Sequence, residues 1–182
     1  VSIELLEENY PGNGADAVSN LVPLQEVAKD PKIKNDGIND AIVFLEVDVP
    51  MELMITANID GTRNTEGYYE IFDYAKTDGA YDSVNDGWVL INTEADDDTV
   101  PTKTTYRYGY NARLAKDAQT TTLFDKVRLA NVIEGELDEQ SKSIEVRAYA
   151  IQADYVNNID TSATLDEATL DNIFTVYSNQ NN

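Results

Sequence analysis

The sequence predicts an all-β domain, a β-sandwich or barrel, followed by one short C-terminal helix. Apolar residues recur at every second position in about eight short segments, and Gly, Pro, Asn and Asp separate these segments. Only one segment, near the C-terminus, has apolar residues at the spacing of a helix. The length of 182 residues predicts a single domain over residues 1–182.

The expected strands follow one another from the N-terminus. Ser2–Leu6 comes first and ends at the loop sequence Asn9–Gly14. Val27–Lys34 is extended, and Pro31 confines it to a sheet edge or a bulge because proline has no amide N–H. Ala41–Val49 alternates most clearly, with Val43, Leu45, Val47 and Val49 on one face and Phe44, Glu46 and Asp48 on the other. The remaining expected strands are Met51–Asn58, Tyr68–Tyr74, Trp88–Thr93, Thr104–Tyr110, Thr121–Ala130 and Lys142–Ala150.

The helix is expected over residues 164–177. Thr164 and Glu167 have the spacing of a capping box, in which each side chain satisfies a free backbone N–H of the first turn. The apolar residues that follow at helical spacing are Leu170, Ile173, Phe174 and Tyr177. Residues 178–182 are expected to form a polar tail.

The composition excludes several kinds of chemistry. The chain has neither histidine nor cysteine, so it cannot build a Ser-His-Asp triad, a cysteine nucleophile, a disulfide or a zinc site with thiolate or imidazole ligands. Its 13 basic and 34 acidic residues give a net charge of −21, which argues against nucleic acid and anionic lipid as partners. No apolar run reaches the length of a membrane span. We therefore expect a protein that is not an enzyme.

Two groups of residues are weak candidates for ligand binding. Asp96, Asp97 and Asp98 form an acidic run that is a candidate calcium site, although the spacing is not that of an EF-hand and a solvated loop is the simpler interpretation. Tyr106, Tyr108 and Tyr110 fall on one face of a strand and, with Trp88, are a candidate platform for stacking a sugar. The alternative for the tyrosines is packing in the core or against a neighbouring subunit.

Three blocks of the sequence, taken together and in their order along the chain, resemble motifs of one protein family. The first is Lys29–Asn35 (KDPKIKN) followed by Asn39–Val47, the second is Thr121–Val127 followed by Asn131–Gly135, and the third is Ile144–Asp154 (IEVRAYAIQAD). Together they resemble the KDP motif with its following strand, the later LF-D strand and the last strand of the TasA/CalY (camelysin) family. The resemblance spans roughly residues 1–155.

The resemblance implies a secreted protein with a jelly-roll sandwich fold, whose signal peptide is handled by the SipW signal peptidase. It also implies assembly into fibres of a biofilm matrix or cell surface. In that family an N-terminal strand of one subunit can complete the next subunit, which propagates a filament. Val1, Ile3 and Leu5 alternate with Ser2, Glu4 and Leu6, which suits an exchanged strand over residues 1–7. Two alternatives are that the true donor strand has been trimmed away, or that residues 1–7 are an ordinary first strand.

The leading hypothesis is a structural filament subunit whose partners are identical subunits, with other matrix components as further candidates. The alternative is a cell-surface module that binds carbohydrate or calcium. Camelysin has been labelled a metallopeptidase, but a chain without histidine or cysteine gives no reason to transfer that activity. No cofactor is expected. Because subunits of charge −21 repel one another, salt or calcium is expected to favour assembly.

Overall fold

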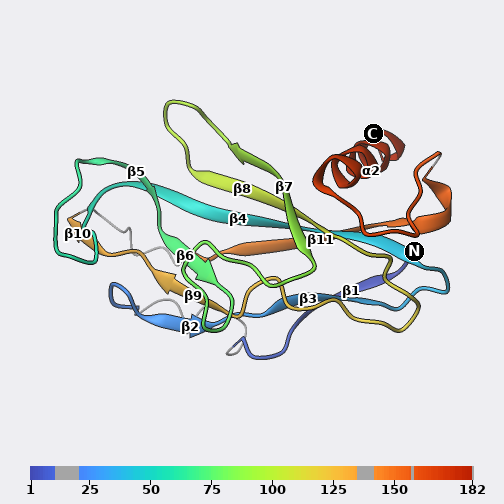
Figure 1. Ribbon diagram of the computed structural model, residues 1–182. Coiled ribbons are helices and arrows are strands. Elements are labelled where there is room, and N and C mark those ends of the chain that lie inside the picture. The colour runs from blue at the N-terminus through green and yellow to red at the C-terminus, as the bar shows by residue number, and fades with distance from the viewer. Residues whose placement is uncertain (11–20, 135–141, 157, 182) are drawn as a thin grey trace.

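The computed structural model describes residues 1–10, 21–134, 142–156 and 158–181. Its strands form two layers, and one helix covers part of the outer face of the upper layer (Figure 1). This arrangement confirms the all-β prediction with a single C-terminal helix. Within the described residues no helix is long and apolar enough to cross a membrane.

The upper layer is built around one long strand, β4 (Ala41–Thr56). Along its first half, β4 lies antiparallel between β11 (Glu145–Gln152) and β8 (Lys103–Tyr110), and β7 (Trp88–Ala95) continues the sheet beyond β8. Along its second half, β4 pairs with β5 (Gly67–Glu70) and β10 (Val132–Glu134). Pro50 lies where the neighbours of β4 change, which is a position where a missing amide N–H costs little.

The lower layer contains two small sheets. One joins β1 (Ile3–Glu7) to β3 (Pro31–Asn35), and the other has the order β2 (Glu26–Ala28), β9 (Lys126–Leu129), β6 (Phe72–Ala75). On the edge away from β1, β3 bonds to the irregular segment 118–123, for example from the N–H of Thr120 to the carbonyl of Ile33.

The main core lies between the two layers. It contains the face of β4 that the alternation predicts to be apolar, with Val43, Leu45, Val47 and Val49 all fully buried. Leu123 and Phe124 enter this core from the segment before β9 and are also fully buried. The prediction of the buried face of Ala41–Val49 is therefore confirmed.

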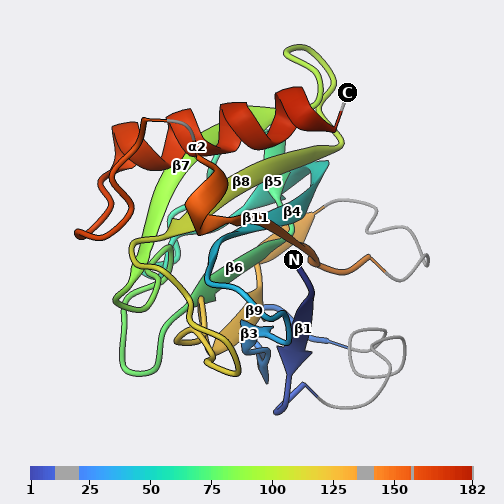
Figure 2. The same cartoon turned by 90° about the vertical axis from the view of Figure 1, so that its right-hand side faces the viewer.

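A second apolar cluster lies on the outer face of the upper layer, beneath α2 (Glu167–Gln180), which follows the short 3-10 turn η1 (Ala153–Tyr155) (Figure 2). Ile42 and Phe44 of β4 contact the buried side of the helix, which consists of Leu170, Ile173 and Phe174. The helix approaches the sheet closely at Gly109, where an added Cβ would lie only 2.9 Å from Cδ2 of Leu170. The predicted apolar face of the helix is confirmed.

The predicted ends of the helix are wrong by a few residues. Asp166, rather than Thr164, caps it, because its carboxylate accepts the N–H of Thr169. The helix also continues through Gln180, so most of the expected polar tail is helical. The side chain of Asn181 donates to the carbonyl of Tyr177 and satisfies one of the free acceptors at this end.

The predicted strand Tyr68–Tyr74 is two strands in different layers. Ile71 separates β5 from β6: its N–H donates to Pro50 of the upper layer, while its carbonyl accepts from Ala130 beside the lower layer. Ile71 is 2% exposed, so the chain crosses between the layers at a buried apolar residue and not at a typical turn residue. Periodicity cannot detect such a change of sheet.

Other elements also differ from expectation, since the expected strands Ala41–Val49 and Met51–Asn58 are one continuous strand, β4, that runs through Pro50. Val27–Lys34 is broken at Lys29 and Asp30, and Pro31 is the first residue of β3, which is an edge strand of a two-stranded sheet, as the missing amide N–H of proline predicts. Only Lys126–Leu129 of the expected strand Thr121–Ala130 is a strand, because residues before it turn to accompany β3. β10 had not been predicted; it is short and its pairing with β4 contains a register shift.

Replacing Leu170 with alanine should destabilise the protein by about 2–5 kcal/mol, because it removes a fully buried side chain from the cluster beneath α2. Urea unfolding followed by the fluorescence of Trp88, the single tryptophan, measures the change. Asn172→Ala, on the exposed side of the same helix, should change stability by less than about 0.5 kcal/mol. Equal effects of the two substitutions would contradict the packing role of Leu170.

Candidate functional site

The N-terminal strand β1 is an edge strand with a single hydrogen-bonded neighbour among the described residues. It lies antiparallel to β3, in a register that places Ile3 opposite Asn35 and Glu7 opposite Pro31. Ile3 and Leu5 are partly buried and pack against the main core. Two of the three residues that the sequence singles out for an exchanged strand thus contribute to the core of their own chain.

Val1, the third residue, is not part of the strand. It is 62% exposed and lines a groove of about 370 Å³ between the end of β11 and the last turn of α2. Ala150 and Gln152 of β11 and Tyr177 and Gln180 of the helix also line this groove. The two ends of the chain therefore lie at the same end of the molecule (Figure 1).

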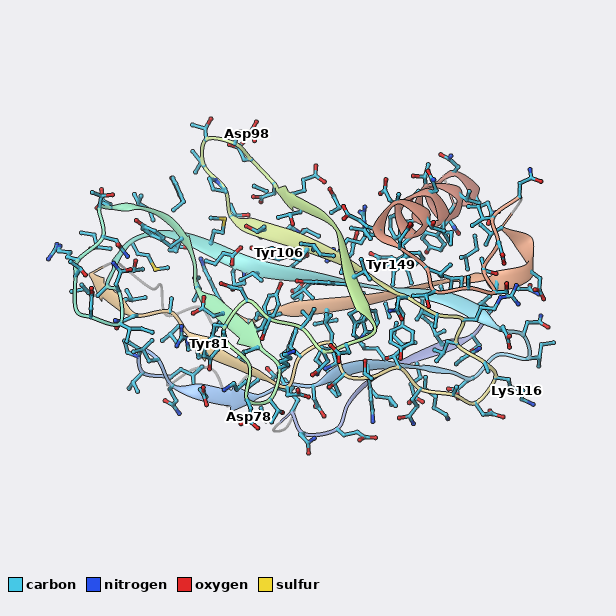
Figure 3. The ribbon with its side chains drawn as sticks, viewed as in Figure 1. Asp78, Tyr81, Asp98, Tyr106, Lys116 and Tyr149 are labelled. Atoms are coloured by element: carbon cyan, nitrogen blue, oxygen red, sulfur yellow. The ribbon has the colours of Figure 1, made fainter. Side chains whose placement is uncertain are left out.

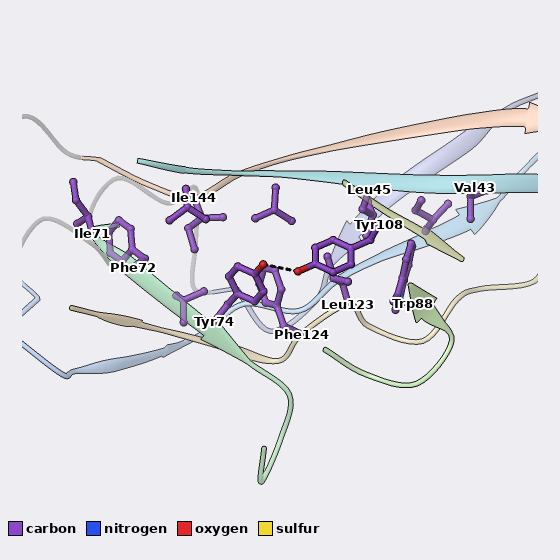
Figure 4. Packing of buried hydrophobic residues seen from close by; sticks show 14 of the residues in the cluster. Val43, Leu45, Ile71, Phe72, Tyr74, Trp88, Tyr108, Leu123, Phe124 and Ile144 are labelled. Carbon is purple, nitrogen blue, oxygen red and sulfur yellow. Dashed lines mark hydrogen bonds between the residues drawn. The ribbon is translucent and has the colours of Figure 1, made fainter. Parts of the chain in front are cut away.

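Tyr106, Tyr108 and Tyr110 share the inner face of β8, as the spacing predicts, and that face is turned toward the core. Tyr108 is 5% exposed, and its hydroxyl lies 2.6 Å from the hydroxyl of Tyr74 across the core (Figure 4). Tyr106 donates a hydrogen bond to Glu70, and the ring of Tyr110 lies 5.1 Å from that of Trp88. Their arrangement is that of the core-packing alternative rather than of an open stacking platform.

Burial alters the acid–base behaviour of these hydroxyls. It raises the pKa of Tyr108 to about 12 and raises the pKa of Tyr74 further, since both phenols are enclosed by the core. Burial also raises the pKa of Glu70, and its hydrogen bond from Tyr106 only partly offsets that effect. The tyrosines therefore remain neutral polar links between β6 and β8.

Asp96, Asp97 and Asp98 lie in the exposed loop that joins β7 to β8, with Asp98 near its tip (Figure 3). The carboxylate of Asp97 accepts the N–H groups of Thr99 and Val100, at 2.7 and 2.8 Å. Asp96 accepts the N–H groups of Thr102 and Lys103. Two of the three acids thus satisfy the backbone of their own loop. The hydroxyl and then the N–H of Thr102 lower the pKa of Asp96, and the N–H groups of Val100 and Thr99 lower the pKa of Asp97.

The described residues contain no group of three or more acidic side chains that could hold a metal ion. The acidic loop is included in that statement, because all of residues 94–98 are described.

A charged network on the outer face of the upper layer had not been predicted from the sequence. Glu46 and Asp48 of β4 are 6% and 4% exposed, although both are acids. Arg147 of β11 contacts both carboxylates, with its Nη2 2.9 Å from Glu46 Oε2 and 3.1 Å from Asp48 Oδ1. Arg107 of β8 bonds to Glu46 on the other side, and its guanidinium carbon lies 3.8 Å from the ring centre of Phe174 in the helix.

The basic residues of this network keep the two acids ionised. Burial acts to raise the pKa of Asp48, but hydrogen bonds from Arg147, Thr105 and Lys103 outweigh it and hold the pKa at about 2. Burial opposes ionisation of Glu46 as well, and Arg147, Arg107 and Tyr149 together lower its pKa. Breaking such a network is costly, because the remaining partner becomes a buried, unpaired charge.

No protein-family model matches the chain, and comparisons with curated proteins and with solved structures give no match either. Any function proposed for the chain is therefore argued from its own residues and from the motif resemblance described above.

Asp48 should contribute stability that depends on pH. Its pKa is lower in the folded state than the ordinary 3.8, so the contribution is complete above about pH 4 and is lost as the pH falls through about 2. The expected loss is about 2 kcal/mol, taken from the pKa difference. Urea unfolding at several pH values between 5 and 2 should therefore show the stability difference between the native chain and Asp48→Asn shrinking by that amount. Asp98→Asn, in the exposed loop, is the matched control, and a difference for Asp48→Asn that stays constant with pH would refute the assignment.

Proposed function

We propose that this chain is a structural subunit of an extracellular filament, in which β1 of each copy replaces β1 in the sheet of the next copy. The acceptor site is the edge of β3 that β1 leaves open when it departs. The partners are identical subunits, and the proposal assigns no catalysis to the chain.

The observation that carries the proposal is the position of β1. Because β1 is an edge strand, its departure disrupts only one row of backbone hydrogen bonds among the described residues. Ile3 and Leu5 leave the core at the same time, and this creates a site that their equivalents from another copy would fill. An open β-edge with alternating pockets is the usual acceptor in strand addition.

The free-energy cost of exchanging β1 between copies is small, so a high protein concentration favours polymerisation. The same contacts form within one copy and between two copies, so the exchange itself costs little, as in domain swapping. Residues 8–25 connect β1 to β2, and eighteen residues can reach roughly 60 Å when fully extended. We propose that each copy donates its strand to one neighbour and accepts a strand from another, which makes the contact heterologous and lets it propagate as a filament.

The motif resemblance supports the same proposal. Lys29–Asn35, which resembles the KDP block of the TasA/CalY family, includes all of β3, the neighbour from which β1 would be exchanged. On this basis we propose that the two layers have jelly-roll topology and that the protein acts outside the cell, in a matrix or at the cell surface. The absence of histidine and cysteine supports a role in assembly rather than in bond cleavage.

A disulfide between β1 and β3 provides a direct test. Glu4 and Lys34 are opposite one another in the register, at the separation that suits a disulfide, and the chain has no cysteine that would interfere. Glu4→Cys/Lys34→Cys oxidised as a dilute monomer should form no filaments by electron microscopy, because β1 is locked in its own sheet. Reduction should restore filaments.

The same variant identifies the strand inside a filament. If reduced protein assembles first and is oxidised afterwards, the disulfides should join neighbouring copies and give a ladder on a denaturing gel. The Glu4→Ser/Lys34→Ser variant controls for the lost charges and should assemble without a ladder. Filaments whose oxidised subunits run as monomers would refute exchange of β1, and native protein that stays dispersed at high concentration would refute the filament itself.

Assembly should become faster and more complete as ionic strength rises from about 10 to 150 mM. Copies of net charge −21 repel one another, and the distance over which charges act falls from roughly 30 to 8 Å over that range. Light scattering during assembly, with calcium and sodium chloride compared at equal ionic strength, separates screening from specific binding. A fibre yield that falls with salt would contradict the electrostatic argument.

A further inference from the structure

The chain immediately after β1 is fastened to the start of β3 by side chains. Asn9 donates from its backbone N–H to Asp30 Oδ1 at 2.9 Å and from its Nδ2 to Asp30 Oδ2 at 2.8 Å. Next to this pair, Lys32 lies 3.0 Å from Oε2 of Glu8. Asp30 is 4% exposed, and these two bonds replace water at its carboxylate.

Lys29 is the buried base of this group. Its side chain is 6% exposed, and its ammonium lies 2.7 Å from Oε1 of Glu7 and 4.1 Å from the ring centre of Tyr10. Glu7 Oε1 is buried and accepts no hydrogen bond of good geometry within the described residues, so the charge of Lys29 is what compensates its burial. An ammonium at this depth needs a partner, and the ones it contacts are supplied by residues 7–10.

Among the described residues, these side-chain contacts connect two short segments of the chain. Residues 7–10 end β1 and lead away from it, whereas residues 29–32 begin β3. When β1 leaves its sheet together with residues 7–10, Lys29 and Asp30 lose these partners together, and only water can replace them. The position of β1 and the environment of these two charges are therefore coupled.

We propose that residues 7–10 and 29–32 form a latch that holds β1 in its own sheet and limits how often the strand is released. This inference rests on the proposed exchange of β1, but it concerns the monomer and can be tested without filaments. In the filament, Glu7 and Asn9 of the donor would meet Lys29 and Asp30 of the acceptor. The latch would then also select the correct register for the incoming strand, because Asn9 makes two bonds to one carboxylate.

Lys29→Met tests the latch, because methionine keeps most of the apolar stem and removes the ammonium. Amide hydrogen exchange, followed by NMR in dilute monomer, should be about tenfold faster or more throughout β1, as expected for the loss of a charge-assisted contact. The N–H groups of Ile33 and Asn35 provide an internal control, since they donate to Thr120 and Ala118 on the other edge of β3 and should keep their protection.

Two further variants complete the experiment. Lys126→Met is the matched control, because Lys126 lies in β9 and pairs with Glu26 of β2, 3.1 Å away, and its loss should leave exchange in β1 unchanged. Asn9→Ala removes the side-chain bond from Nδ2 to Asp30, keeps the bond from the backbone N–H, and changes an exposed position, so it should accelerate exchange in β1 even if Lys29→Met fails to fold.

The outcomes separate the latch from the filament. Exchange in β1 that is unchanged in both Lys29→Met and Asn9→Ala would overturn the latch, whether or not filaments form. Faster exchange together with a shorter lag before assembly supports both proposals. Faster exchange in a protein that forms no filaments under any condition would uphold the latch and refute the proposed exchange between copies.

Discussion

The burial of both faces of β4 along residues 41–49 is the constraint on which the rest of the structure depends. Strand β4 pairs with β5, β8, β10 and β11, so any change in its register would displace most of the upper layer. Its inner face is apolar and needs only the lower layer to cover it. Its outer face is mixed: Ile42 and Phe44 require α2, and Glu46 and Asp48 require arginines from β8 and β11. The helix and the charged network thus cover successive positions on the outer face of one strand.

Phe174 of α2 contacts both the apolar cluster beneath the helix and the charged network. Its ring contacts Phe44 of the apolar half in an edge-on arrangement, with centres 5.1 Å apart, and the guanidinium of Arg107 from the charged half. Arg107 can therefore neutralise Glu46 while its flat face remains against an aromatic ring, a combination that lysine does not offer. Packing of the helix and compensation of the buried acids are for this reason not independent.

The sequence was sufficient to predict the features that depend on local pattern. The alternation in Ala41–Val49 identified the inner face of β4, and the spacing of Leu170, Ile173 and Phe174 identified the buried side of α2. It could not show that Ile71 changes layers, because an apolar residue has the same pattern in either sheet. It also could not pair Glu46 with Arg147, 101 residues away, since only the folded register brings them together. For the candidate site, alternation located β1, but its neighbour β3 and the contacts of Lys29 are properties of the tertiary structure.

The placement of the chain ends has a practical consequence for anyone who labels or displays this protein. Val1 lies in the same groove as Gln180 and Asn181, at one end of the molecule, whereas β5 and β10 lie at the other (Figure 1). A fluorescent protein or affinity tag fused to either terminus would occupy the region around β1 and would crowd any partner that docks there. The turn between β4 and β5, in which Ile59 is 87% exposed and Gly61 adopts a positive φ, is distant from that region. An inserted peptide would be tolerated better there than a fusion at an end.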